Sequence, residues 1–297
     1  MMKIRVMTLN LGGGIKNFSG MEVPASHKSE ALQQLITEIR PDVLAVQELS
    51  QYVDADGISH NMLTRIRREG RFNHTFYGET LSMKTHMQVK KDVMVNGLFN
   101  DWYDWSKGNA LFSRLSFSRL GNVHKDGSPR NIPIFEPLFY EGTRDTDPRY
   151  VILSRLKSAP FPFIVNLHLT TLVGERDENA SLETINAAHT VRTEQMRRIL
   201  ALLQVHVLTP QLPLIMMGDF NAPEDEFAIK TLLEEENGFT RLVPANPMPT
   251  HGSAGCVDHI FFYPRSRLLE YSCRVVSGDT AELASDHLPV VADLVLE

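Results

Sequence analysis

The feature of this sequence that most constrains its fold is a series of short apolar runs that end in polar or charged residues. Residues 4–10 end in Asn10 before three glycines, and residues 42–47 are followed by Glu48. Compact apolar runs bounded by turn signals predict buried strands. Between these two runs, residues 26–39 carry apolar side chains at helical spacing up to a proline, which stops a helix. The order strand, helix, strand favours a layered α/β fold.

The rest of the chain continues this pattern of apolar runs and turns. Further strands are expected at residues 109–114, 150–156, 163–169, 213–217, 257–263, 271–276 and 289–295. Helical spacing predicts a short helix over residues 62–68 and a long one over residues 182–206. Arg192 and Gln195 fall on the polar side of the long helix, so we expect Arg192 to face solvent.

The connections indicate how the chain is organised. Residues 121–147 are rich in Pro, Gly and Asp and predict a loop. The segment 81–108 has an irregular pattern with clustered aromatic residues, which is typical of an insertion between core strands. Because no repeat and no Pro/Gly/Ser-rich linker divides the chain, we expect one domain over residues 1–297.

Composition excludes several protein classes. The 297 residues are 42% hydrophobic and 22% charged, which is typical of a soluble globular protein and not of a disordered chain. The two cysteines exclude a disulfide framework and a cysteine-rich zinc site. A net charge of -6 gives no global argument for nucleic-acid binding, which depends on clustered cations. Because the sequence has no transmembrane segment and no signal-peptide pattern, we expect a cytoplasmic protein.

The polar residues at the ends of the apolar runs share one chemistry. They are Asn10, Glu48, His168, Asp219, Asn221, Asp258, Asp286 and His287. A side chain at the end of a buried strand can project into a cleft while the sheet holds its backbone rigid. Carboxylate and amide oxygens suit Mg²⁺, with Mn²⁺ or Ca²⁺ as alternatives, better than zinc. Two histidines with acids nearby suit acid–base catalysis and the stabilisation of anionic oxygens.

Two common catalytic motifs are missing from the sequence. The glycines at residues 12–14 lack the following Lys-Ser/Thr of a nucleotide-binding phosphate loop. No Gly-x-Ser-x-Gly segment presents a serine nucleophile. Without an evident protein nucleophile, the residues favour attack by water with the help of a metal ion.

Seven short segments contain the polar residues at the ends of the apolar runs, and together they extend along nearly the whole chain. They are residues 8–10, 41–48, 108–114, 166–169, 218–221, 257–260 and 285–289. Each segment is weak alone, but the ordered set resembles the endonuclease/exonuclease/phosphatase superfamily. The resemblance implies the fold class α/β (α+β): a four-layered α/β/β/α sandwich in which two mixed β-sheets pack face to face with helices outside. It also implies Mg²⁺-dependent hydrolysis of phosphoester bonds.

The resemblance carries metal-binding roles to three positions. Glu48 corresponds to the main Mg²⁺ ligand, and Asn10 helps to hold that site. Asp286 is expected beside them as a metal ligand or as support for its neighbour in the sequence. The metal site would therefore draw on both ends of the chain.

Catalytic roles are implied for five further residues. Asp219 would orient or deprotonate the attacking water, and Asn221 would bind a phosphate oxygen. His287 would contact the scissile phosphate, with Asp258 as a support for one of the histidines. His168 would act as a general acid or stabilise the pentacoordinate transition state. These groups neutralise the charge that phosphoryl transfer spreads over the non-bridging oxygens.

The substrate is less constrained than the reaction. Asn109 and Arg114 are candidate substrate-binding residues, although Arg114 is more simply explained as a structural residue. A histidine at position 168 disfavours the abasic-site endonucleases, and the missing Trp-Cys-Asp-Arg segment before Asp258 disfavours the inositol phosphatases. Members of the superfamily usually have an arginine just before the strand aspartate, and at that place this chain has Cys256-Val257.

Two cationic clusters and one aromatic pair are candidate substrate contacts. The clusters are Lys84, Lys90, Lys91 and Lys107 in the insertion, and Arg65, Arg67, Arg68 and Arg71 near the short helix. Neither amounts to a basic patch that indicates nucleic acid. Trp102 and Trp105 could form the membrane-contacting hairpin of a sphingomyelinase. The alternatives to a phosphodiesterase are a phosphomonoesterase of the same fold and a catalytically inactive binding module. We expect the protein to be a monomer.

Overall fold

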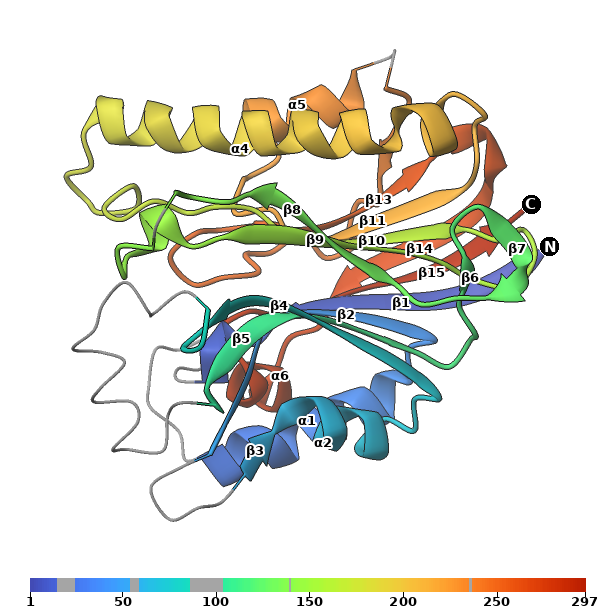
Figure 1. Cartoon of the computed structure of the whole chain (residues 1–297), viewed down its shortest axis with the longest axis horizontal. Coiled ribbons are helices and arrows are strands. Elements are labelled where there is room, and N and C mark those ends of the chain that lie inside the picture. The colour runs from blue at the N-terminus through green and yellow to red at the C-terminus, as the bar shows by residue number, and fades with distance from the viewer. Residues whose placement is uncertain (15–24, 54–58, 86–103, 139, 235–236) are drawn as a thin grey trace.

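Two β-sheets pack face to face, and helices cover the outer face of each sheet (Figure 1). The computed structural model describes residues 1–14, 25–53, 59–85, 104–138, 140–234 and 237–297. This architecture confirms the expected four-layered α/β/β/α sandwich.

The first sheet combines both ends of the chain. In spatial order it contains β14 (Leu268–Val275), β15 (Val290–Leu296), β1 (Met2–Asn10), β2 (Val43–Val53), β5 (Ser106–Ser113) and β4 (His74–Ser82), with β3 (Ser59–Asn61) paired to the end of β2. β1 and β2 run parallel, as expected for a strand–helix–strand unit, and the other pairs are antiparallel. The chain termini lie side by side because β1 pairs with β15 along its length (Figure 1).

The second sheet comes from the middle and later parts of the chain. Its spatial order is β12 (Thr240–Arg241), β13 (Asp258–Tyr263), β11 (Leu214–Asp219), β10 (Phe163–His168), β9 (Arg149–Arg155) and β8 (Arg130–Phe135). A separate hairpin joins β6 (Ser118–Arg119) to β7 (Asn122–Asp126). β7 and β8 lie inside residues 121–147, so the loop predicted there is wrong in part.

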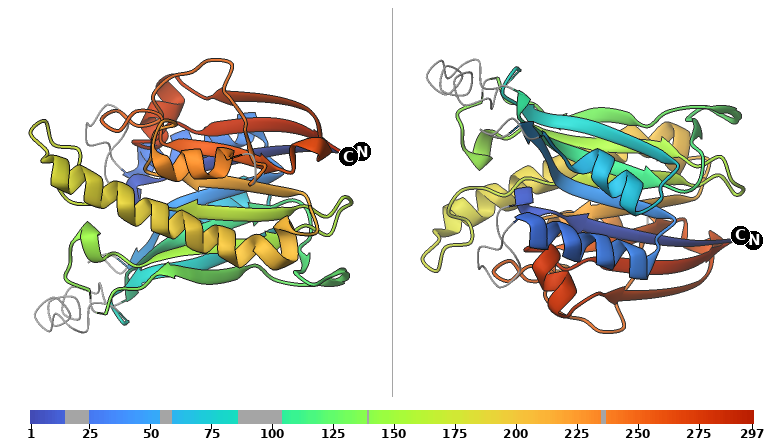
Figure 2. Two further views of the ribbon diagram at one scale, coloured as in Figure 1. Left: turned by 90° about the horizontal axis from the view of Figure 1, so that it is seen from above. Right: turned by 90° about the horizontal axis from the view of Figure 1, so that it is seen from below.

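The helices divide between the two outer faces (Figure 2). α1 (Ala25–Ile39), α2 (Met62–Glu69) and α6 (Asp279–Ala284) lie over the first sheet. α4 (Leu182–Leu203) and α5 (Phe227–Leu233) lie over the second, and α4 continues into a π-helical turn over Gln204–Leu208. Short 3₁₀ turns occupy Gly12–Gly14, Arg144–Thr146 and Arg265–Arg267. No helix in the described ranges is long and apolar enough to cross a membrane.

Strand alternation separates the core from the site. On β10, Val165 and Leu167 belong to the cluster of buried apolar side chains under α4, whereas Ile164 belongs to the core between the sheets. The polar residues Asn166 and His168 follow Ile164 at every second position and therefore face the inside of the sandwich. The inner face of the sheet thus changes from apolar to polar toward one end.

The long helix is more deeply buried on its polar side than expected. Arg192 is 3% exposed and bonds to Glu226 through Nε and Nη2, and its Nη1 bonds to both carboxylate oxygens of Glu175. Gln195 is also buried, where it bonds to Thr170. The expectation that Arg192 faces solvent is wrong, because the acids that neutralise it come from two other segments.

Most of the predicted insertion lies outside the described residues. β4 ends at Ser82 and β5 begins at Ser106, and residues 86–103 between them are not described, Lys90, Lys91 and Trp102 among them. At the base of this connection, the backbone N–H of Met83 donates to the carbonyl of Trp105 at 3.1 Å. The role predicted for the aromatic pair therefore stays a prediction.

Candidate active site

Strand register aligns three of the predicted residues across the second sheet. On β10, β11 and β13, His168 pairs with Asp219, and Asp219 pairs with Asp258. All three face the inside of the sandwich at the same end of the sheet, and each is at most 5% exposed. A row of neighbouring side chains on adjacent strands is held rigidly, because the backbone ladder fixes its spacing.

Glu48 reaches this end through an irregularity in β2. By alternation, Gln47 points inward and Glu48 points toward the helices. A β-bulge between Val46 and Leu49, together with a left-handed backbone at Glu48 (φ 52°), redirects its side chain. As a result Glu48 Oε1 lies 3.9 Å from Nε2 of His168, on the opposite sheet.

Gly12 allows Asp286 to approach the end of β1. Its backbone is left-handed (φ +56°), and a Cβ atom there would stand 2.0 Å from Oδ1 of Asp286. Its N–H donates to Oδ1 of Asn10 at 2.9 Å. Burial, and then the neighbouring Glu48 carboxylate, raise the pKa of Asp286, so the two acids face a common space. The glycine run thus shapes a carboxylate site and not a phosphate loop.

Asp219 is held by hydrogen bonds from β1 and from the turn that follows β11. Its Oδ2 accepts from Asn10 Nδ2 at 2.8 Å, and its Oδ1 accepts from the backbone N–H of Asn221 at 2.8 Å. Burial and the neighbouring Asp258 raise the pKa of Asp219, whereas His287 lowers it. A buried carboxylate whose pKa is raised is suited to accept a proton from water.

His287 and Asp258 form a buried ion pair. The His287 Nδ1 donates to Asp258 Oδ2 at 2.8 Å, and Nε2 faces Asp219 at 3.9 Å. Burial lowers the pKa of His287, but the facing carboxylates outweigh it and raise the pKa to about 10. The other oxygen of Asp258, Oδ1, is buried without a hydrogen-bond partner in the described part of the chain. His251 packs against this ring with centroids 4.6 Å apart.

These three side chains could also hold a cation. Ligand atoms of Asp219, Asp258 and His287 lie within 4.8 Å of one another. This group differs from the predicted metal ligands Glu48, Asn10 and Asp286, although it adjoins them through the bond from Asn10 to Asp219. Nδ1 of His287 already donates to Asp258, whereas the predicted ligands offer carboxylate and amide oxygens, which are hard donors of the kind that Mg²⁺ prefers.

His168 differs from His287 in its charge state. Its Nε2 lies 3.4 Å from Asp219 Oδ2, and Arg149 Nη1 lies 3.1 Å from its Nδ1. Burial, and then the cations of Arg149 and Lys107, hold the pKa of His168 well below its usual range. The ring is therefore neutral, and it accepts a hydrogen bond from the guanidinium, which can only donate.

Two arginines at the site were missed by the sequence analysis. Arg149 begins β9 and is buried, and its Nε has no hydrogen-bond partner within the described ranges. Arg176, from the loop after β10, donates to Oδ1 of Asn221 at 2.6 Å. The side-chain amide of Asn221 also donates to the Leu169 carbonyl at 2.9 Å. Neither arginine belongs to a strand-end motif, so no sequence signal marked it.

The two predicted substrate-binding residues lie at different levels of β5, since Asn109 is inside the strand and Arg114 follows its last residue. Asn109 is buried beside the site, and its Nδ2 donates to the Tyr150 carbonyl at 3.1 Å. Arg114 donates to the carbonyls of Pro41 and Gly70. Val43 at the start of β2 pairs with Ser113, which places Arg114 far from Glu48, so its predicted contact with substrate stays a prediction and its observed bonds are structural.

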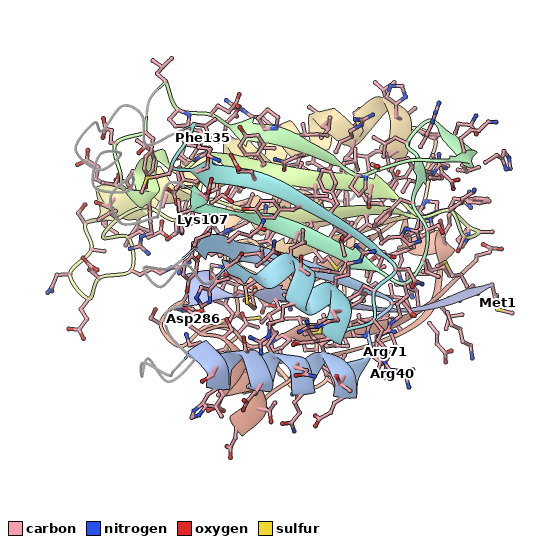
Figure 3. All side chains as sticks on the ribbon, turned by 60° about the horizontal axis from the view of Figure 1, so that its bottom comes forward. Met1, Arg40, Arg71, Lys107, Phe135 and Asp286 are labelled. Carbon is pink, nitrogen blue, oxygen red and sulfur yellow. The ribbon has the colours of Figure 1, made fainter. Side chains whose placement is uncertain are left out.

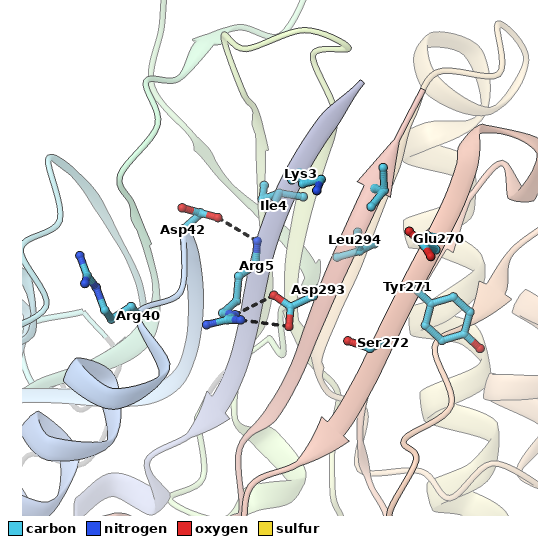
Figure 4. A pocket seen from close by; sticks show the side chains of 11 residues that line it. Lys3, Ile4, Arg5, Arg40, Asp42, Glu270, Tyr271, Ser272, Asp293 and Leu294 are labelled. Carbon is cyan, nitrogen blue, oxygen red and sulfur yellow. Dashed lines mark hydrogen bonds and ion pairs between the residues drawn. The ribbon is translucent and has the colours of Figure 1, made fainter.

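Figure 3 shows the same separation in the whole molecule. Lys107 and Asp286 lie toward one end, and Met1, Arg40 and Arg71 lie toward the other. A groove of about 520 Å³ near that second end is lined by Arg5, Asp42 and Asp293 (Figure 4). Arg5 Nε bonds to Asp293 at 2.7 Å, and its backbone N–H bonds to Asp42. Among the described residues that line this groove there is no predicted site residue.

A buried amide cluster connects the two sheets beneath the site. Asn166 on β10 donates to the carbonyls of Val46 and Ala110 on the first sheet and accepts from Gln47 Nε2 at 2.7 Å. Gln47 Nε2 also donates to the hydroxyl of Thr8. Satisfied polar networks specify one geometry, so this cluster fixes the distance between the halves of the site.

Comparison with known proteins identifies the family of this chain. The profile of the Endonuclease/Exonuclease/phosphatase family matches residues 7–287. The chain belongs to this family. Its members are metal-dependent, phosphoesterase-type hydrolases, and the carboxylate and histidine cluster of this chain agrees with that chemistry. None of the curated proteins matches the chain.

Solved structures share the fold at low sequence identity. An endonuclease/exonuclease/phosphatase from Beutenbergia cavernae is 18% identical, with a TM-score of 0.66, over 100% of this chain and 72% of that one. A protein of the same description from Bacteroides vulgatus is 16% identical, with a TM-score of 0.65, over 100% of both chains. The human Nocturnin catalytic domain with bound sulfate is 19% identical, with a TM-score of 0.63, over 99% of this chain and 95% of that one.

Proposed function

We propose that this protein is a Mg²⁺-dependent phosphodiesterase in which water attacks phosphorus. The observation that carries the proposal is the Asp258–His287 ion pair, which lies 3.9 Å from Asp219 at the same end of the sandwich as Glu48 and Asp286. This arrangement combines a proton acceptor, a proton donor and a carboxylate-lined metal site. That combination is what hydrolysis of a phosphoester requires when no protein nucleophile is present.

The residues that would hold the metal are Glu48, Asp286 and Asn10. Two successive glycines support this set, because Gly12 lies against the carboxylate of Asp286 and Gly13 lies against that of Glu48. Mg²⁺ favours carboxylate ligands, and it would supply positive charge to a phosphoryl oxygen. The Asn10 amide would orient the site, because it also bonds to Asp219 and to the glycine turn.

The protein groups account for the protons of the reaction. Asp219 takes a proton from the water as its oxygen bonds to phosphorus. The imidazolium of His287 gives the proton on Nε2 to the leaving ester oxygen as the P–O bond breaks, while Asp258 holds Nδ1. Proton transfer by positioned side chains typically accelerates a reaction by a factor of about 10²–10⁴.

The remaining groups bind the phosphate oxygens. We assign the second N–H of the Asn221 amide to a phosphoryl oxygen, because the first is bonded to Leu169. Neutral His168 donates through one ring nitrogen, since its low pKa disfavours a role as general acid. The sulfate anion in the structure of the human Nocturnin catalytic domain supports the proposal, because sulfate resembles phosphate in shape and charge.

A substrate pair tests the proposal. Bis(p-nitrophenyl) phosphate is a diester, and p-nitrophenyl phosphate is the matching monoester with the same leaving group. We expect Mg²⁺-dependent hydrolysis of the diester, with EDTA abolishing it and His287→Ala losing most of it. Faster turnover of the monoester would indicate a phosphomonoesterase. No turnover of either ester with Mg²⁺ or Mn²⁺ would indicate a binding module.

A further inference from the structure

A second cavity shares Glu48 with the site as a lining residue. Its volume is about 560 Å³, and it lies on the outer side of the first sheet between α1, β2, β3 and α2. Glu48 lines both this cavity and the small hollow that contains His168 and Arg149. We call it the side cavity. Small-molecule sites have volumes of about 300–1,000 Å³, so the side cavity is large enough for a substituent of the substrate.

One wall of the side cavity is aromatic. Tyr52 on β2 and His60 on β3 pair across the two antiparallel strands. Their rings are stacked, with centroids 4.6 Å apart and an angle of 14° between planes. Leu32 and Met62 add apolar surface nearby. A wall of this kind favours a planar ring, because aromatic faces and edges pack against one another.

The other wall of the side cavity is cationic. Lys28 from α1 and Arg65 and Arg68 from α2 line it, and Glu48 is the one acid among the described lining residues. Arg65 Nε bonds to Glu69 Oε1 at 3.0 Å, which orients its guanidinium. Lys28 is only 6% exposed, so its ammonium is largely removed from water. The side chain of Arg65 is 37% exposed and that of Arg68 is 76% exposed, so Lys28 and Arg65 are the partly desolvated cations that favour an anion. A guanidinium also matches the geometry of phosphate.

We propose that the side cavity binds a nucleoside monophosphate unit of the substrate. This inference rests on the proposed function, because it places the scissile phosphorus at the Glu48 opening. The base packs against Tyr52 and His60, and the phosphate of the same unit binds Arg65. The substrate class is therefore a nucleotide ester whose leaving group is itself a nucleotide. An aromatic wall and a cationic wall on one cavity fit that combination better than a choline or inositol headgroup, which has no planar ring.

Binding of product analogues tests the inference without catalysis. The full chain is titrated calorimetrically with AMP, adenosine and ribose 5-phosphate in EDTA, so that the phosphate cannot bind through a metal ion. We expect AMP to bind at least about tenfold more tightly than either fragment, because each fragment lacks one of the two recognised groups. Equal affinity for all three, or no binding of AMP, would overturn the inference. Tighter binding of phosphocholine or inositol phosphate than of AMP would also overturn it.

Two arginines on α2 provide a matched pair of variants. Arg65→Gln should weaken AMP binding about tenfold, because a charge-assisted hydrogen bond to the phosphate is lost. Arg67→Gln removes the same charge from the same helix, but Arg67 is exposed and does not line the cavity, so AMP affinity should stay within twofold of the wild type. Tyr52→Leu should weaken adenosine and AMP binding and leave ribose 5-phosphate unaffected. Equal losses in Arg65→Gln and Arg67→Gln would show a diffuse charge effect and reject the site.

The two proposals fail in different ways. If bis(p-nitrophenyl) phosphate is hydrolysed but AMP does not bind, the phosphodiesterase stands and the nucleotide site is rejected. If AMP binds with the expected dependence on Arg65 but neither p-nitrophenyl ester is hydrolysed, the cavity assignment stands and the proposed activity is rejected.

Discussion

Two buried clusters of charge in the described part of the chain differ in how completely their charges are matched. One is the site cluster of Asp219, Asp258 and His287, with Glu48 and Asp286 beside it. The other is the α4 network, in which Arg192 bonds to Glu175 and Glu226. Both are enclosed by the fold, so burial alone does not distinguish them.

Hydrogen bonding separates the two clusters. In the α4 network, the carboxylate oxygens of Glu226 accept from Arg192, and those of Glu175 accept from Arg192, Thr171 and the Leu172 backbone. In the site cluster, Asp258 Oδ1 is buried without a hydrogen bond in the part of the chain that the structure describes. A buried cluster that satisfies itself stabilises the fold, whereas one with surplus acids is suited to bind a cation or to react.

The largest expected effect is on catalysis. Glu48→Gln keeps the size of the side chain and removes its charge, so Mg²⁺-dependent hydrolysis of bis(p-nitrophenyl) phosphate should fall by about 10³-fold or more in kcat/KM. The free energy of unfolding should stay the same or rise, because one of several mutually repelling acids is removed. Glu178→Gln, at an exposed acid, is the control and should leave both quantities unchanged. A Glu48→Gln enzyme with more than a tenth of wild-type activity would contradict the metal-binding role.

The next largest effect is on stability. Arg192→Met should lower the free energy of unfolding by about 3–5 kcal/mol, because it leaves two buried carboxylates without their cation. Urea denaturation measures the loss. Arg198→Met, which breaks an exposed pair with Glu194 on the same helix and a bond to the Ile134 carbonyl, should cost about 1.5 kcal/mol or less. Similar losses in the two variants would remove the distinction between the α4 network and a surface ion pair.

Magnesium should act on one cluster and not on the other. At about 100 times its dissociation constant, Mg²⁺ should raise the free energy of unfolding by about 2.7 kcal/mol. Thermal unfolding with and without the ion measures this gain. The double variant Glu48→Gln/Asp286→Asn should lose the gain, and Arg198→Met should keep it. If the double variant is stabilised as strongly as the wild type, the ion binds elsewhere.

Arg176 connects the two clusters and should give the smallest effect. It bonds to Asn221 at the site, and its Nε lies 3.5 Å from Glu175 of the α4 network. Arg176→Met should lower kcat/KM about tenfold, as is typical when a group that orients a site residue is lost. Arg176→Lys should recover part of that loss, since it keeps the charge. A change in stability with no change in activity would assign Arg176 to the α4 network alone.

Much of the fold and of the site could be predicted from the sequence, because strands combine local pattern with rigid register. Asp219 and Asp258 each occur at one end of an apolar run, and pairing of β11 with β13 brings them together. The same logic places Asn10 and His168 at that end of the sandwich. His259 follows Asp258 on the strand and by alternation faces the other way, with Nε2 bonded to the Ala222 carbonyl.

What could not be predicted depends on segments far apart in the sequence. Arg192 looks solvent-exposed on a helical wheel, and only the folded chain brings Glu226 against it. Arg149 and Arg176 contact the site from a strand start and a loop, where no periodicity indicates a role. Arg114 lies within a segment similar to the family, but the length of β5 carries it to the far end of the sheet.

The bulge before Leu49 makes the site depend on how many residues β2 contains there, as well as on which residues they are. One residue in this stretch of β2 has no partner on β5, and it shifts the phase of the strand so that Gln47 stays inside while Glu48 reaches the cleft. Deleting a single residue there would restore a regular ladder and rotate the following side chains by half a pleat. A shift of one residue in the register of β2 would therefore move Glu48 out of the carboxylate site, although every catalytic residue would still be present in the sequence.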